Sequence, residues 1–495
     1  MRSKKAVMNI VFSLLLQIIT IFCSFILPKL IISAYGSNVN GLVASITQFL
    51  AFITLLESGF GPVIKSMLYK PIANKNKDEI ARILKASERI FRVISFIFIL
   101  YICILCIVLP IKLIQEFNWT FTFSLIIIIA ISIFAEYFFG MTYRLYIQAK
   151  QKTYVIAIIQ ISTLILNVIS VLILIYLNQS IQVVKLVSSL IFVLRPILLN
   201  LYVKKKYDIN LKNIDNTYKI ENKWDGLAQH VAYVVHTNAD IAILTICTDL
   251  IQVSIYSVYL MIINGVKYIV EACTGGIDAA FGDMIAKEEH ENMNKNFKIY
   301  EGFYFTISTI AFLSTIFLII PFVKLYTRGI TDANYINPLF AYIMVIAEFI
   351  CMIRQPYNDL VKVAGHFKQT RIGAWIEVIT NILVSFILVW KYGIVGVALG
   401  TLVAMLIRTV EFMYYTSKYI LKRNIWFSYR NLFIIIIEML MITLIMNVIP
   451  NLEINNYKQW ILSAIFVCVI ASIVTLLING FVYKDSFNNV LRKLK

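Results

Sequence analysis

Apolar runs long enough to cross a bilayer recur along almost the whole chain, and this feature limits the possible folds more than any other. A run of roughly 20 apolar residues spans the hydrocarbon core as a helix. Inside lipid each run must be helical, because every backbone N–H and C=O needs an internal partner. The chain is 60% hydrophobic with a mean hydropathy of +0.80, which is more apolar surface than one soluble core buries. The sequence therefore predicts an integral membrane protein.

The apolar runs predict an all-α polytopic protein with about fourteen transmembrane helices. The seventh run is the least apolar of the set. Because a missing span would invert every later loop, the topology depends on counting that run as a helix. The expected spans are 8–32, 41–64, 93–112, 120–143, 154–177, 181–203, 226–247, 250–277, 302–322, 336–356, 371–391, 393–416, 430–449 and 459–482.

The net charge of +18 does not indicate nucleic-acid binding, because the basic residues sit in short clusters between apolar runs. With the N-terminus in the cytoplasm, 34 of the 45 Lys and Arg residues fall in cytoplasmic segments and five in outside loops. This bias follows the positive-inside rule. We therefore expect a multi-pass membrane protein with both termini cytoplasmic. We separately expect the chain to act as a monomer.

Motifs of soluble enzymes are missing from the sequence. There is no phosphate-binding loop, no dinucleotide fingerprint, no zinc-protease helix and no nucleophile elbow. The CxxC formed by Cys103 and Cys106 has no second pair or histidine cluster beside it, so it indicates helix packing. We expect no cofactor, no metal and no catalytic residue, and these absences favour a transporter over an enzyme.

An internal repeat with an offset of 212–217 residues divides the chain. Glu57 near the end of the second span matches Glu271 in the eighth, and ordered pairs follow in four successive helices. Six helices per repeat give two lobes of the same orientation, related by a pseudo-two-fold axis along the membrane normal. We expect an N-terminal lobe at 1–206, a cytoplasmic linker at 207–225, a C-terminal lobe at 226–422, and two additional helices with a tail at 423–495. The later pairs are Glu136 with Glu348, Gln160 with Glu377, and Arg195 with Arg408.

A basic, amphipathic cytoplasmic stretch follows Glu57 in the first lobe, and a similar stretch follows Glu271 in the second. Apolar residues fall on one face at 80–91 and again at 293–304. Such a face suits the inner membrane surface, so we expect both stretches to lie there.

Polar stripes mark the first helix of each lobe. In the first span, residues at helical spacing from Asn9 to Ser24 include Gln17. In the seventh, Tyr233, His236 and Asp240 lie on one face. Lipid excludes such stripes, so each faces either a water-filled cleft or another helix.

Charges inside the apolar runs are candidate functional groups, because each costs at least about 2.5–3.5 kcal/mol at mid-bilayer. Lys267 shares a face with Asn264 and Glu271, and it either pairs with Glu271 or offers its charge to an anionic substrate. Arg354 likewise either forms a structural ion pair or offers its charge to an anionic substrate. Arg195 and Arg408 either bind substrate or extend to the inner surface. The acids Glu57, Glu136, Glu348 and Glu377 recur by symmetry and are expected to tie loops and helices, while Asp240 and Glu271 are candidates for ion coupling.

Residues 1–482 resemble the multidrug/oligosaccharidyl-lipid/polysaccharide exporter superfamily, which has two six-helix lobes and often two further helices. Within it, Glu57-Ser58-Gly59-Phe60-Gly61 and Leu68-Tyr69-Lys70-Pro71-Ile72-Ala73 resemble the Wzx-type polysaccharide flippases. The resemblance implies export of an undecaprenyl-pyrophosphate-linked oligosaccharide from the inner to the outer leaflet by alternating access. It also implies contact with membrane lipids, coupling to H⁺ or Na⁺, and a polysaccharide polymerase and assembly proteins as partners, with capsule or O-antigen as the product.

Three alternatives stay open. A cation-coupled multidrug exporter of the same fold requires a deep acidic residue, for which Asp240 is the best candidate. The second alternative is a lipid II flippase. A membrane-bound polymerase or glycosyltransferase is disfavoured by the internal repeat and by the absence of a large outside loop.

Overall fold

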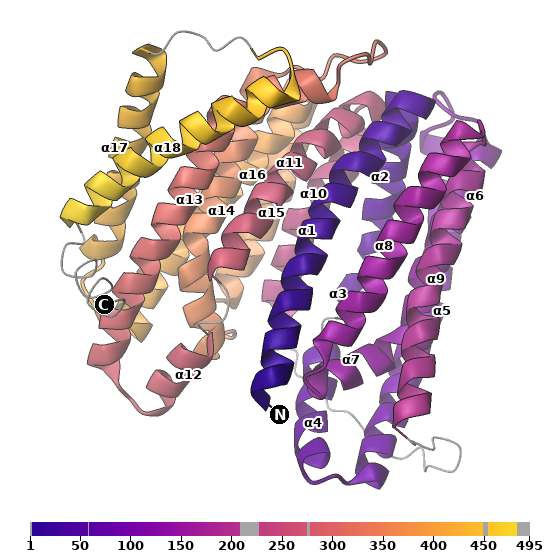
Figure 1. The fold of residues 1–495 in the computed structure, drawn as a ribbon, viewed down its shortest axis with the longest axis horizontal. Helices are drawn as coiled ribbons and strands as arrows, with labels where there is room; N and C mark the ends of the chain where they lie inside the picture. The colour runs from indigo at the N-terminus through magenta and orange to yellow at the C-terminus, as the bar shows by residue number, and fades with distance from the viewer. Residues whose placement is uncertain (1, 58, 208–226, 275–277, 449–453, 483–495) are drawn as a thin grey trace. The chain divides into compact units, whose positions relative to one another are not determined.

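The computed structural model describes residues 2–57, 59–207, 227–274, 278–448 and 454–482, and these form helices joined by short connections (Figure 1). Fourteen helices are long and apolar enough to cross a membrane, as predicted from the apolar runs. The seventh, Gln229–Cys247, has the lowest mean hydropathy of the set at 1.2, and 61% of its most apolar stretch is buried inside the protein. Because protein rather than lipid surrounds this helix, it tolerates the polar residues that weakened its signal in the sequence.

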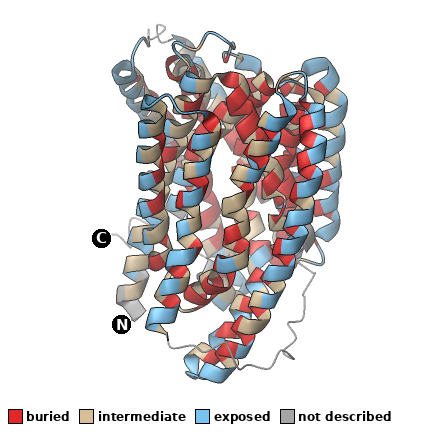
Figure 2. Ribbon diagram, turned by 90° about the vertical axis from the view of Figure 1, so that its right-hand side faces the viewer, coloured by how far each residue is buried: buried red, intermediate tan, exposed pale blue. Residues whose placement is uncertain are grey.

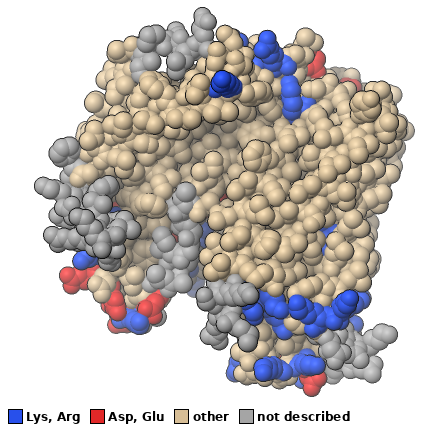
Figure 3. Space-filling model, viewed as in Figure 1, with Lys and Arg blue, Asp and Glu red and all other residues tan. Residues whose placement is uncertain are grey.

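Two compact units make up the chain, Met1–Ser257 and Val258–Lys495, and we describe each by itself. Each exposes many large apolar side chains, as expected of surfaces that face lipid. Along the helices in Figure 2, exposed faces alternate with buried faces. On the face of the first unit shown in Figure 3, the middle of the helices is almost free of charge, and Lys and Arg gather at the end near α4 and α7. The lobe boundaries predicted from the repeat stay a prediction.

The first unit contains α1 to α10 and the start of α11. Long helices α1, α8 and α9 pack as neighbours, and α6 packs on α9. The bounds are α1 Arg2–Tyr35, α2 Ser37–Ala51, α3 Thr54–Glu57, α4 Gly61–Ala73, α5 Lys77–Lys112, α6 Trp119–Ala135, the π-helix Glu136–Gly140, α7 Met141–Ala149, α8 Thr153–Tyr176, α9 Ile181–Lys206, α10 Leu227–Cys247 and α11 Leu250–Thr274.

The second unit continues α11 and contains α12 to α18. The helices α14, α15 and α16 pack closely, and α13 packs on both α14 and α18. The bounds are α12 Asp278–Ala286, α13 His290–Tyr326, α14 Pro338–Val363, α15 Arg371–Tyr392, α16 Ile394–Tyr415, the π-helix Thr416–Ile420, α17 Trp426–Val448 and α18 Tyr457–Val482.

The amphipathic stretches are not separate surface helices, so that expectation was wrong. Residues 80–91 form the first turns of α5, which continues without a break into the membrane span. Their apolar face, with Ile83, Leu84 and Phe91, is buried where α5 packs against α4 and α7. Residues 293–304 likewise begin α13, with Met293 and Phe297 buried. Protein neighbours cover these apolar faces, and the membrane surface is not required to do so.

Candidate functional site

A cavity of about 390 Å³, whose walls are mostly apolar but carry several polar side chains, lies in the first unit between α6, α8 and α9, with α2 at its edge. Its volume falls in the range of roughly 300–1,000 Å³ common for ligand sites. The lining residues of α9 follow helical spacing, so one face of that helix forms a wall. The polar residues of the lining are Thr47, Ser132, Glu136, Tyr137, Arg144, Gln160, Lys185, Ser188, Ser189 and Arg195.

A π-helical turn at Glu136–Gly140 positions the acidic wall of this cavity. Short π segments within α-helices often lie at functional sites, since the extra residue rotates the side chains that follow. Gly140 allows the turn to approach α9: an added Cβ would lie 2.7 Å from Pro196 Cβ and 3.2 Å from Glu136 Oε2. Tyr137 OH donates to Glu57 Oε2 at 2.9 Å, which joins the turn to the end of α3.

Three cations and one carboxylate face this cavity. Arg144 Nη1 lies 3.4 Å from Glu136 Oε1, so those two charges pair. Arg195 Nε donates to the neutral Thr163 Oγ1 at 2.8 Å, and its guanidinium lies 4.1 Å from the centre of the Phe192 ring. Within the part of the chain that the structure describes, no carboxylate lies within ion-pair distance of Arg195 or Lys185. The cavity therefore carries a surplus of positive charge within the span of the membrane helices.

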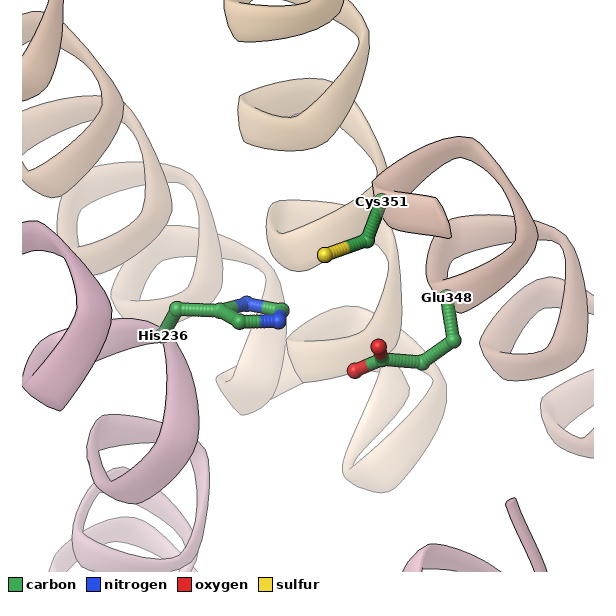
Figure 4. Close-up of side chains that lie close together, drawn as sticks. All are labelled: His236, Glu348 and Cys351. Carbon is green, nitrogen blue, oxygen red and sulfur yellow. The ribbon is translucent and has the colours of Figure 1, made fainter. Parts of the chain in front are cut away.

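The predicted cations of the second unit are, in contrast, neutralised. Lys267 Nζ of α11 donates to Glu348 Oε2 of α14 at 2.7 Å, and the two side chains are only 15% and 6% exposed. Figure 4 shows Glu348 and Cys351 one turn apart on α14, and Cys351 Sγ accepts from Arg354 Nη2 at 3.6 Å. The sequence offered Glu271 as the partner of Lys267, but its direct ion pair is with Glu348.

Glu377 of α15 binds two arginines. Its Oε1 lies 2.8 Å from Arg354 Nη1 and its Oε2 lies 3.2 Å from Arg408 Nε. Arg408 also pairs with Glu411 and donates to the Thr370 carbonyl at 3.1 Å. Arg408 is 1% exposed, so it does not extend to the inner membrane surface. Both Glu348 and Glu377 thus form ion pairs between helices, and their role as structural acids stays a prediction.

Arg195 and Arg408, which the sequence repeat pairs, have different partners in the structure. Arg195 matches Arg408 in sequence, and both lie beside the fifth helix of their repeat. At the matched position of that helix, Glu377 neutralises Arg408, whereas Gln160 carries no charge. The α8 side chain that Arg195 contacts is the neutral Thr163.

The remaining predicted residues differ in burial and in their contacts. Gln17 on α1 and Asn264 on α11 are half-buried, and Tyr233 is exposed while His236 and Asp240 are buried. Asp240 Oδ2 accepts from Tyr256 OH at 2.6 Å. Asn9, in the stripe of α1, bonds to the α7–α8 connection: its Nδ2 donates to the Gln151 carbonyl at 3.1 Å, and its Oδ1 accepts from the Tyr154 N–H at 3.0 Å. Helix packing thus accounts for part of each stripe.

Sequence reasoning missed Lys185 and Arg144 as site residues. A signal for Lys185 existed, because Lys185, Ser188, Ser189 and Arg195 fall on one face of an otherwise apolar helix. Arg144 gave no such signal, because its position at the end of a span is ordinary for a lipid-flanking charge.

The described helices define the class: a polytopic α-helical membrane protein. The fold resembles that of the lipid II flippase MurJ in an inward closed conformation, with a TM-score of 0.68 at 16% identity over 97% of this chain and 99% of that chain. An inward-facing multidrug resistance MATE family transporter of the MOP superfamily follows at a TM-score of 0.57 and 12% identity, covering 80% of this chain and 94% of that one.

A third similar structure is the MATE transporter VcmN of Vibrio cholerae in its bent form. It has a TM-score of 0.52 at 14% identity, over 84% of this chain and 97% of that chain. No protein-family model matches the sequence, and no curated protein matches it. At these identities the comparisons show the fold that this chain shares with flippases and multidrug transporters, in agreement with the predicted fold class.

Proposed function

We propose that this protein is a flippase that moves an undecaprenyl-pyrophosphate-linked oligosaccharide from the inner to the outer leaflet of a bacterial plasma membrane. The observation that carries the proposal is the surplus of positive charge in the cavity of the first unit, where Lys185 and Arg195 have no carboxylate partner among the described residues. The fold is one that flippases and transporters use, and this supports transport rather than catalysis.

The cavity matches the chemistry of such a headgroup. An unpaired cation inside a membrane helix is costly unless water or an anionic ligand compensates it. Pyrophosphate offers several charged oxygens, and an arginine guanidinium binds two of them at once. The hydroxyls of Ser132, Ser188 and Ser189 and the amide of Gln160 supply hydrogen bonds of the kind that sugars accept and donate. One cavity therefore offers partners for both parts of a glycosylated lipid pyrophosphate.

A single substitution tests this proposal without removing any cation. Gln160→Glu places a carboxylate one helical turn from Thr163, which contacts Arg195, and so copies the arrangement that neutralises Arg408. We expect binding of an undecaprenyl-pyrophosphate-linked sugar to proteoliposomes to fall by about tenfold or more, which corresponds to ~1.4 kcal/mol. Native mass spectrometry and a fluorescent leaflet assay measure binding and movement.

The matched control is Gln179→Glu, the same change at an exposed position in the α8–α9 connection. It should leave binding and movement unaltered. Full activity of Gln160→Glu in a protein that inserts normally would contradict the role given to this cavity, whereas loss of activity in both variants would point to a general charge effect.

A second candidate is a lipid II flippase, which the likeness to MurJ over nearly the whole of both chains favours. The cationic cavity suits either substrate, so lipid II and an undecaprenyl-pyrophosphate oligosaccharide are compared in the same leaflet assay. A cation-coupled exporter is a further alternative, because Asp240 is a buried acidic residue with only 3% of its surface exposed. Transport of a cationic drug that depends on Asp240, with no response to lipid pyrophosphates, would favour that exporter.

The charge distribution predicts the topology on which the direction of transport depends. Reporter fusions after Lys65 and after Lys206 should lie in the cytoplasm, and a fusion after Lys458 should lie outside. Alkaline phosphatase and green fluorescent protein fusions read the two sides separately. A phosphatase signal after Lys206 would overturn the proposed orientation.

A further inference from the structure

A carboxyl group is buried in the membrane part of α17 with no positive charge beside it. Glu438 is 1% exposed, and its Oε1 has no hydrogen-bond partner among the described residues. Thr309 Oγ1 of α13 lies beside the carboxyl, but outside good hydrogen-bonding geometry. Buried polar groups in native proteins are nearly always satisfied, so this group calls for an explanation.

Three helices of the second unit surround this carboxyl. The helices α13, α17 and α18 pack together around Leu313, Ile442 and Ala471, which form an apolar layer. Thr309 and Glu438 lie four residues before this layer on α13 and α17, and Thr475 lies four residues after it on α18, which runs the opposite way. Thr309, Glu438 and Thr475 thus form a polar level one helical turn from the apolar layer. Like Glu438 Oε1, Thr475 Oγ1 has no hydrogen-bond partner among the described residues.

No charged group from these helices faces Glu438 in the described structure. The nearest titratable residues along the three helices are Tyr304 and Glu301 on α13, Arg430 on α17 and Cys468 on α18, each at least five residues from the polar level. An ionised carboxylate without a partner is very costly in an apolar setting, while the neutral acid is far less so. The packed arrangement therefore requires the protonated form.

We infer that Glu438 is an intramembrane proton-binding site, and that its protonation is coupled to the packing of α17 and α18 on α13. When the helices pack, the carboxylate takes one proton from water and becomes a neutral acid. When they separate, the acid returns the proton to water. No other bond forms or breaks in this step.

Polar groups lead from Glu438 toward one end of the unit. One turn along, Asn479 Nδ2 of α18 donates to Thr306 Oγ1 of α13 at 3.0 Å. Farther along α13, Glu301 accepts a hydrogen bond from Tyr357 OH. Glu301 also pairs at 2.8 Å with Nη2 of Arg423, a residue of the connection that precedes α17. Polar side chains therefore recur along α13 between the level of Glu438 and the connection before α17.

Infrared difference spectroscopy of the full-length protein in liposomes tests the inference directly. Between about pH 6 and about pH 9, the wild type should show the C=O stretching band of a protonated carboxylic acid that loses intensity as the pH rises. Glu438→Gln should lack this band, because its amide has the shape of the neutral acid but cannot ionise. Glu291→Gln, an exposed change at the start of α13, should keep it.

A stability measurement checks the coupling to packing. Because the folded state holds the proton more tightly than the unfolded state, the contribution of Glu438 is present at low pH and is lost as the pH rises. From about pH 6 to about pH 9 the Tm of the wild type should therefore fall by roughly 2–4 °C more than that of Glu438→Gln. A band that persists in Glu438→Gln, or equal pH dependence of the two Tm values, would overturn the inference. Neither measurement involves the transported substrate.

Discussion

Lys267→Met should lower the free energy of unfolding by about 3–5 kcal/mol, because it leaves the Glu348 carboxylate buried without its ion-pair partner. The two groups are 2.7 Å apart and little exposed, and they join α11 to α14 within the second unit. Thermal unfolding of the purified protein in detergent measures the change. The protein should also accumulate to a lower level in membranes.

The double change Lys267→Met with Glu348→Gln should recover most of that loss, since no lone charge is left buried. Lys287 provides the control: it pairs with Asp283 at the same 2.7 Å, but both side chains are more than half exposed, so Lys287→Met should change stability little. A double variant that folds normally but no longer exports would show that Lys267 contacts the substrate. Equal effects of Lys267→Met and Lys287→Met would contradict the role of burial.

The membrane spans were predictable because each depends on local composition alone. An apolar run of about 20 residues signals a helix wherever it lies in the fold. The true starts of α5 and α13 were not predictable in this way, because the amphipathic faces with Leu84 and Phe297 suit a membrane surface and a protein neighbour equally well. For the face with Leu84, it is the packing of α4 and α7 against α5 that shows a protein neighbour and not the membrane surface.

The charges were found from the sequence, but their partners were not. Helical spacing pairs Lys267 with Glu271, because residues four apart share a face. The partner in the structure, Glu348, comes from another helix, and the sequence contains no measure of how α11 and α14 pack. The same limit hid the cavity: Arg195 was a candidate by sequence, but its contact with the neutral Thr163 and the nearness of Lys185 and Arg144 come from helix packing.

A close contact between α15 and α16 in the second unit depends on Gly400. Gly396 and Gly400 lie four residues apart on α16, a spacing of small residues that lets membrane helices approach closely. An alanine Cβ at Gly400 would lie 2.0 Å from Ser385 Oγ and 2.6 Å from the Ser385 backbone nitrogen on α15. Because backbone cannot move aside cheaply, Gly400→Ala should cost about 3 kcal/mol. Thermal unfolding in detergent measures the loss.

Gly480→Ala is the matched control for Gly400→Ala. Gly480 also lies inside a membrane helix, α18, but an added Cβ there meets no atom within 4 Å. Without a clash, the higher helix propensity of alanine should stabilise the protein by up to about 1 kcal/mol. The two substitutions add the same methyl group, so opposite signs would isolate the effect of the α15–α16 contact. A small or positive change at Gly400 would instead mean that α15 and α16 separate easily and that this pair does not form a rigid part of the unit.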